Sequence, residues 1–114
     1  MSQPLIIYVD VDDTLVRSVG TKRIPMPAVV AKVKSLAAEG ATLYAWSSGG
    51  AAYARESAQE LGILECFVEF LPKPQVLIDD QPPSEWRHLI HIYPTDAPSR
   101  SIAELRKAHE QGAG

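Results

Sequence analysis

Short hydrophobic runs alternate with longer amphipathic segments along this chain. Each short run is closed by turn-forming residues, a pattern typical of buried strands, whereas the longer segments place apolar residues at helical spacing. Pro27 suits the first position of a helix, and Gly40 and Gly62 suit the position just after one. We therefore expect strands at about 5–10, 42–46, 66–70, 75–79 and 89–93, and helices at about 27–39, 51–61 and from 99 or 101 to 110.

The order of these elements indicates a mostly parallel sheet with helices on both faces. We expect a Rossmann-like, three-layer α/β/α fold with a five-stranded sheet, and a chain of 114 residues has room for one domain, 1–114. The polar segment 16–27 is interpreted as a small flap in which Gly20 and Thr21 turn between two extended arms. Ser101 and Glu104 have capping-box spacing at the last helix, and the tail 111–114 is expected to fray.

Composition narrows the classes of function. Hydrophobic residues make up 46% and charged residues 22% of the chain, which is ordinary for a globular protein with a real core. The net charge of −3 argues against nucleic acid as a partner, because such binding needs a basic face. Neither a leader-like N-terminus nor a membrane-spanning apolar run is present, so we expect a cytoplasmic protein without a membrane partner. Cys66 is the only cysteine and is expected to be a small core residue.

Three acids directly follow the first predicted strand. Asp10, Asp12 and Asp13 lie where ligands bind in open α/β sheets, beyond the carboxyl end of a strand. Asp10 and Asp12 point the same way in extended backbone, because side chains alternate with period two. Their mutual repulsion is relieved by a divalent cation, and hard carboxylate ligands suit Mg²⁺. Taken alone, however, this cluster is more typical of an acidic turn.

Reactive side chains also follow the later strands. Ser47 and Ser48 precede a glycine pair and a predicted helix. Lys73 lies in a short turn, and Asp79 and Asp80 lie at the end of the predicted strand 75–79. Each is common in a turn, at a helix start or on a surface when taken singly. Together they supply a carboxylate nucleophile, hydrogen-bond donors and a counter-charge for phosphoryl transfer.

This succession of motifs resembles the haloacid dehalogenase superfamily over residues 5 to 80. Asp10-Val11-Asp12-Asp13-Thr14 is similar to its first motif, with Asp13 at a position that is often glycine in the family. The resemblance implies that Asp10 is the nucleophile and Asp12 the general acid and base.

The later motifs of the family are matched in order. The resemblance implies that Ser47, with Ser48 and Gly49, binds the phosphate, and that Lys73 balances charge on the transferring group. It also implies that Mg²⁺ is held at a site formed by Asp10, the Val11 carbonyl, Asp12, Asp79 and Asp80.

The large insertions of the family, its caps, are missing from this sequence, so we expect an open site with only the flap beside it. The flap cations Arg17, Lys22 and Arg23 either meet an anionic substrate or are simply solvated. The substrate is expected to be a phosphorylated molecule, small or macromolecular, and a homo-oligomer is left open.

The function expected from these features is that of a Mg²⁺-dependent phosphatase working through an aspartyl-phosphate. One alternative is a catalytically weak relative that binds Mg²⁺ or phosphate without useful turnover. The other is a receiver-type signalling domain, which needs a phospho-accepting aspartate after its third strand. No aspartate occurs between Asp13 and Asp79, so this last alternative is strongly disfavoured.

Overall fold

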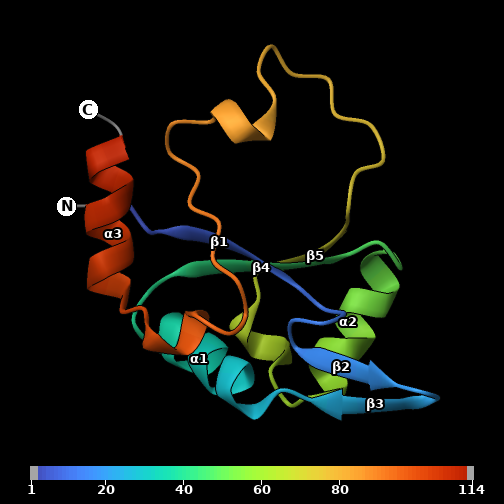
Figure 1. The fold of residues 1–114 in the computed structure, drawn as a ribbon. Helices are drawn as coiled ribbons and strands as arrows, with labels where there is room; N and C mark the ends of the chain where they lie inside the picture. Colours follow the sequence, from blue (N-terminus) through green and yellow to red (C-terminus); the bar gives the residue numbers. More distant parts are fainter. Residues whose placement is uncertain (1–2, 113–114) are drawn as a thin grey trace.

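The computed structural model describes residues 3–112, with side chains up to Glu110. Its main sheet contains β1 (Ile6–Asp10), β4 (Thr42–Ser47) and β5 (Glu69–Pro72), all parallel, with β4 in the middle (Figure 1). Asp10 pairs with Trp46, and Ser47 pairs with Pro72. The carboxyl ends of the strands therefore meet at one edge of the sheet, as expected for an α/β fold.

A small hairpin follows β1. Its arms β2 (Val16–Val19) and β3 (Lys22–Pro25) are antiparallel, and Gly20 and Thr21 form the turn between them. Gly20 has a φ of 62°, a conformation that glycine adopts without steric cost. The predicted turn between two extended arms is thus confirmed, and the hairpin projects beyond the end of the sheet beside α2 (Figure 1).

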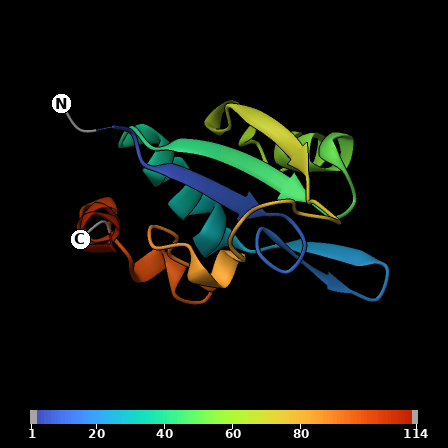
Figure 2. The ribbon, with the colours of Figure 1, turned by 90° about the horizontal axis from the view of Figure 1, so that it is seen from above.

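The first two predicted helices are confirmed as α1 (Pro27–Ala38) and α2 (Ala51–Glu60). Pro27 occupies the start of α1, and Gly40 and Gly62 follow the two helices with positive φ angles of 94° and 73°. Both helices lie on the same side of the sheet (Figures 1 and 2). The core between them and the sheet contains Val9, Val29, Val33, Leu36, Leu43, Ala45, Ala54, Ala58 and Phe70.

The opposite face of the sheet carries no α-helix in the described chain, so the predicted three-layer arrangement is not confirmed. Tyr8 on β1 packs against Tyr44 and Trp46 on β4, with ring centroids 5.1 and 5.0 Å apart, and Tyr8 remains 47% exposed. The last helix, α3 (Ile102–Gly112), lies instead beside the start of β1 (Figure 2). A 3₁₀ turn at Ala97–Ser99 packs against α1 and leads into α3 at the start of β1.

The ends of α3 partly match the prediction. The Ser101 hydroxyl accepts a hydrogen bond from the Glu104 N–H at 3.1 Å, so Ser101 caps the helix. The Glu104 carboxylate turns to Arg100 (3.5 Å) rather than back to the cap. Gln111 and Gly112 continue the helix, while the rest of the tail that was expected to fray lies outside the described residues. None of the described helices is long and apolar enough to cross a membrane.

Two predicted strands do not form within residues 3–112, so the sheet has three strands rather than five. Segments 75–79 and 89–93 belong to an arch between β5 and α3, interrupted by a 3₁₀ turn at Pro83–Glu85 (Figure 1). Val76 is 77% and Ile78 96% exposed. A strand needs a hydrogen-bonded neighbour, and neither segment has one. The edge of β1 that faces away from β4 could accept a strand, but neither segment pairs with it.

The strand predicted at 66–70 begins later than expected. Leu64–Cys66 forms a 3₁₀ turn, the Val68 N–H then reaches the Leu43 carbonyl at 2.8 Å, and regular pairing starts at Glu69. Cys66 is half-buried against the core, and burial raises the pKa of its thiol. A thiol with a raised pKa is a weak nucleophile, consistent with a packing role.

Candidate active site at the carboxyl ends of the strands

The acidic turn after β1 is fixed by the residues between its acids. Val11 and Leu15 are completely buried, and the Leu15 N–H donates to the Val11 carbonyl at 2.9 Å. Asp13 has a φ of 62° and its N–H donates to the Val16 carbonyl. This left-handed conformation favours glycine and is tolerated by aspartate, which explains why an acid can stand here. The buried pair anchors the turn and leaves Asp12 and Asp13 exposed at its surface.

Asp10 is held from two directions at the end of β1. The Lys73 ammonium nitrogen lies 3.3 Å from Asp10 Oδ1, and the Thr14 hydroxyl lies 3.4 Å from Oδ2. Lys73 follows β5 directly, and its nitrogen is 5.7 Å from the centre of the Trp46 ring. The structure therefore brings the lysine of the third expected motif to the aspartate of the first.

The turn after β4 forms the floor of the site. Ser47 is 1% exposed, its hydroxyl accepts the Gly49 N–H at 3.0 Å, and its carbonyl accepts the Lys73 N–H at 2.9 Å. Ser48 and Gly49 are exposed just before α2 begins at Ala51. The first N–H groups of a helix lack partners within it, and its dipole favours an anion there. The N–H groups at the start of α2 therefore follow directly on the turn that contacts the Lys73 backbone.

Tyr53, which the sequence analysis did not single out, reaches Asp12 from the first turn of α2. Its hydroxyl donates to Asp12 Oδ1 at 2.6 Å across a separation of 41 residues. The hydrogen bond to Asp12, then partial burial, raises the pKa of the Tyr53 phenol. A tyrosine soon after a glycine-rich turn is a weak signal on its own, so only the folded arrangement identifies this contact.

The flap cations do not act as one group. Arg23 turns toward α2, where its guanidinium contacts Glu60 Oε2 at 2.6 Å and the Ser57 hydroxyl at 2.8 Å. It thereby fastens the hairpin to the helix instead of facing a substrate. Arg17 lines a shallow hollow with Asp13, and Lys22 is exposed at the hairpin turn. Of the three, Arg17 is the one that lines a hollow next to the acidic turn.

No family model and no curated protein matches this chain. Among solved structures, the chain is similar to the crystal structure of an MCSG target from Vibrio cholerae. The two superpose with a TM-score of 0.62 at 17% sequence identity, covering 94% of this chain and 98% of that one. At this identity the likeness shows a shared α/β fold.

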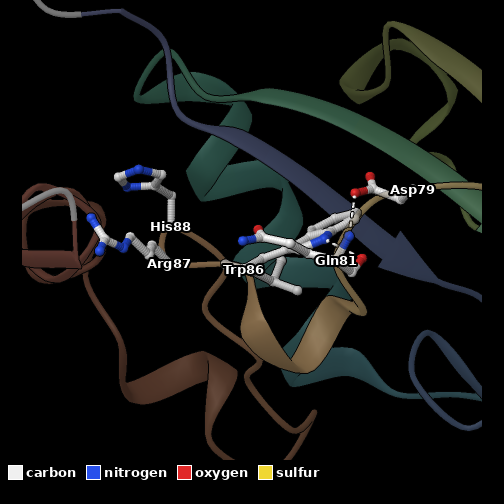
Figure 3. Close-up of a pocket in the computed structure, with 6 residues that line it drawn as sticks. Asp79, Gln81, Trp86, Arg87 and His88 are labelled. Atoms are coloured by element: carbon white, nitrogen blue, oxygen red, sulfur yellow. Dashed lines mark hydrogen bonds between the residues drawn. The ribbon is translucent and has the colours of Figure 1, made fainter.

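The fourth expected motif lies apart from the others, in the arch. Asp79 Oδ1 accepts the Gln81 N–H at 3.0 Å, a local turn contact, and Asp80 is exposed. Asp79 lies at one end of a hollow of about 500 Å³, and Arg87 and His88 lie toward the other end (Figure 3). Trp86 lines the hollow and donates its ring N–H to the Gln81 carbonyl at 3.3 Å.

The acids expected to hold Mg²⁺ are thus not assembled into one site in this arrangement. Within residues 3–112, no group of three or more histidine, cysteine, aspartate or glutamate side chains is placed to hold a metal ion. Asp10 has Lys73 as its counter-charge, and Asp12 has Tyr53 as a hydrogen-bond donor. The described geometry therefore pairs one carboxylate, Asp10, with a cation and leaves a second, Asp12, exposed on the same turn.

Proposed function

We propose that this protein is a phosphoric monoester hydrolase with a haloacid dehalogenase-like site. The observation that carries the proposal is the approach of Lys73 to Asp10, 3.3 Å apart, at the edge where the Ser47 turn and the start of α2 also lie. Segments distant in sequence converge there with the types of group that phosphoryl transfer uses. An acidic turn with a purely structural role does not require a lysine and a helix start beside it.

In the proposed reaction an Asp10 oxygen attacks phosphorus as the bond to the leaving oxygen breaks, and Asp12 gives its proton to that oxygen. Water then attacks the phosphorus of the aspartyl-phosphate, Asp12 takes a proton from that water, and the bond from phosphorus to the Asp10 oxygen breaks, which releases phosphate and restores both aspartates. Lys73 offsets charge on the phosphoryl oxygens, and the N–H groups at the start of α2, which lack partners within the helix, bind them. Asp12 is exposed on the open side of the turn, where a leaving group can reach it.

The proposal also includes an additional strand in the main sheet. We infer that segment 75–79, which was expected to be a strand from its sequence, pairs with the free edge of β1 as a further parallel strand. Val76 and Ile78, now 77% and 96% exposed, would gain burial worth about 1.5–3 kcal/mol for each side chain that becomes fully covered. Such pairing would end the strand near Asp10 and supply Asp79 as a further carboxylate. Mg²⁺ would then be held by Asp10 and Asp79 and would offset phosphate charge. The Val11 carbonyl, which was expected to be a ligand, instead accepts the backbone N–H groups of Thr14, Leu15 and Val16.

The open site suits phosphorylated substrates of different sizes. The hairpin is fastened to α2 by Arg23 and covers one side only, so a macromolecular phosphate could approach as well as a small ester. Discrimination among small esters should accordingly be weak, because few groups beyond the phosphate site can contact them.

The decisive test compares Asp10→Asn with Asp96→Asn, a matched change at an exposed aspartate of the arch. Hydrolysis of nitrophenyl phosphate should fall at least about 10³-fold in the first variant and remain unchanged in the second. Thermal melts would show that both variants fold. Full turnover by Asp10→Asn would refute the mechanism, and a wild-type protein that binds phosphate without hydrolysing esters would favour the catalytically weak relative.

A further inference from the structure

The Tyr53 ring is held in place on both the helix and the flap side of the site. A Cβ atom at Gly49 would come 2.9 Å from Tyr53 Cδ2 and 3.1 Å from Cγ, so the ring rests against the glycine backbone. The Arg23 guanidinium carbon lies 5.2 Å from the ring centre, and Arg23 is itself fixed by Glu60 and Ser57. The position of the Tyr53 hydroxyl is therefore defined by packing.

Asp12, in contrast, has little around it. Its side chain is exposed on the turn, and the Tyr53 hydroxyl, 2.6 Å away, is the side-chain partner that the structure gives it. An exposed carboxyl group rotates freely unless a hydrogen bond selects one orientation. The hydrogen bond from the packed Tyr53 ring therefore fixes the orientation of the Asp12 carboxyl group.

The chemistry of this contact suits an acid that must both lose and regain a proton. The phenol donates to Oδ1, which leaves Oδ2 available to carry the proton. Oδ1 can accept the bond whether Oδ2 is ionised or protonated, since a protonated carboxyl keeps an acceptor oxygen. Asp12 would thus keep one orientation through both halves of the proposed reaction.

We propose, building on the proposed hydrolase function, that Tyr53 is a positioning residue that orients Asp12 for proton transfer to and from the leaving oxygen. In the proposed reaction Lys73 offsets charge on the phosphoryl group and does not contact the leaving group, so its role is separate from this one. Arg23 and Gly49 support the same orientation through the ring. The hairpin is then coupled to the acid as well as to α2.

The test uses Tyr53→Phe, which removes one hydroxyl and keeps the ring, with Tyr44→Phe on the opposite sheet face as the control. The readout is kcat/KM for an alkyl phosphate and for nitrophenyl phosphate. An alkyl leaving group needs the proton, and general acid catalysis contributes about 10²- to 10⁴-fold, so Tyr53→Phe should lose about tenfold or more on the alkyl ester and less than about twofold on the nitrophenyl ester. Tyr44→Phe should leave both values unchanged.

A double variant separates positioning from a general structural effect. In an Asp12→Asn background, Tyr53→Phe should change kcat/KM for the alkyl ester by less than about twofold, because the group it orients is already gone. Equal losses on both esters, no loss on either, or additive effects in the double variant would overturn the inference while leaving the hydrolase function intact. A wild-type protein inactive on both esters would overturn the proposed function, and this inference with it.

Discussion

Replacing Lys73 by methionine should separate catalysis from stability at this site. The Lys73–Asp10 pair is 3.3 Å apart, and the two side chains are 36% and 30% exposed. Coulomb attraction at this distance is about 1 kcal/mol in bulk water and about 5 kcal/mol at an effective dielectric of 20. Loss of hydration and of side-chain freedom offsets most of that attraction, so partly exposed pairs contribute about 0–1 kcal/mol net.

We therefore expect Lys73→Met to lower the free energy of unfolding by no more than about 1 kcal/mol. The effect on turnover should be much larger, about 10²- to 10³-fold in kcat/KM, because charge on the phosphoryl group grows where the ammonium lies. The assay is hydrolysis of nitrophenyl phosphate beside urea unfolding of the same variant. Lys107→Met, an exposed lysine on α3, is the control. Undiminished hydrolysis by Lys73→Met would remove the main support for the proposed function.

The two remaining predictions concern Mg²⁺ and pH. A ligand that binds only the native state stabilises the protein by about 2.7 kcal/mol when its concentration is about a hundred times its Kd. Saturating Mg²⁺ should therefore raise the melting temperature of the wild type and not that of Asp79→Asn. An unchanged wild-type melting temperature would refute the idea that pairing of segment 75–79 with β1 creates a metal site. The pKa of Tyr53 is raised in the folded state by its bond to Asp12, so the stability lost in Tyr53→Phe should be constant below pH about 10 and disappear as pH rises through the raised pKa. Urea unfolding at several pH values would check this, and a difference that grows above pH 10 would contradict it.

Local signals in the sequence were enough to predict the elements around the site. Pro27 and the glycines after the helices act through their own backbone conformations, so the bounds of α1 and α2 follow from short segments. The Gly20–Thr21 turn of the hairpin is equally local. The Ser101 cap needs only the N–H three residues later.

The contacts that arrange the site depend on segments far apart in the chain. Tyr53 meets Asp12 across 41 residues, and Arg23 meets Glu60 across 37. A basic residue on a flap predicts a charge near the site, yet only the packing of the hairpin against α2 decides which partner it takes. The motifs predicted the approach of Lys73 to Asp10, whereas the contact of Tyr53 with Asp12 became visible from the fold alone.

The placement of both crossover helices on the same face of the sheet has a single topological cause. Strand–helix–strand crossovers are right-handed, and the steps from β1 to β4 and from β4 to β5 go in the same direction across the sheet. Both crossover helices must then lie on the same face, as α1 and α2 do (Figure 2). A helix on the other face requires the chain to reverse and add a strand beyond β1. Three observations therefore have the same origin: the exposed aromatic face of Tyr8, the free edge of β1 and the separation of Asp79 from Asp10. Pairing of segment 75–79 with β1 would change all three together.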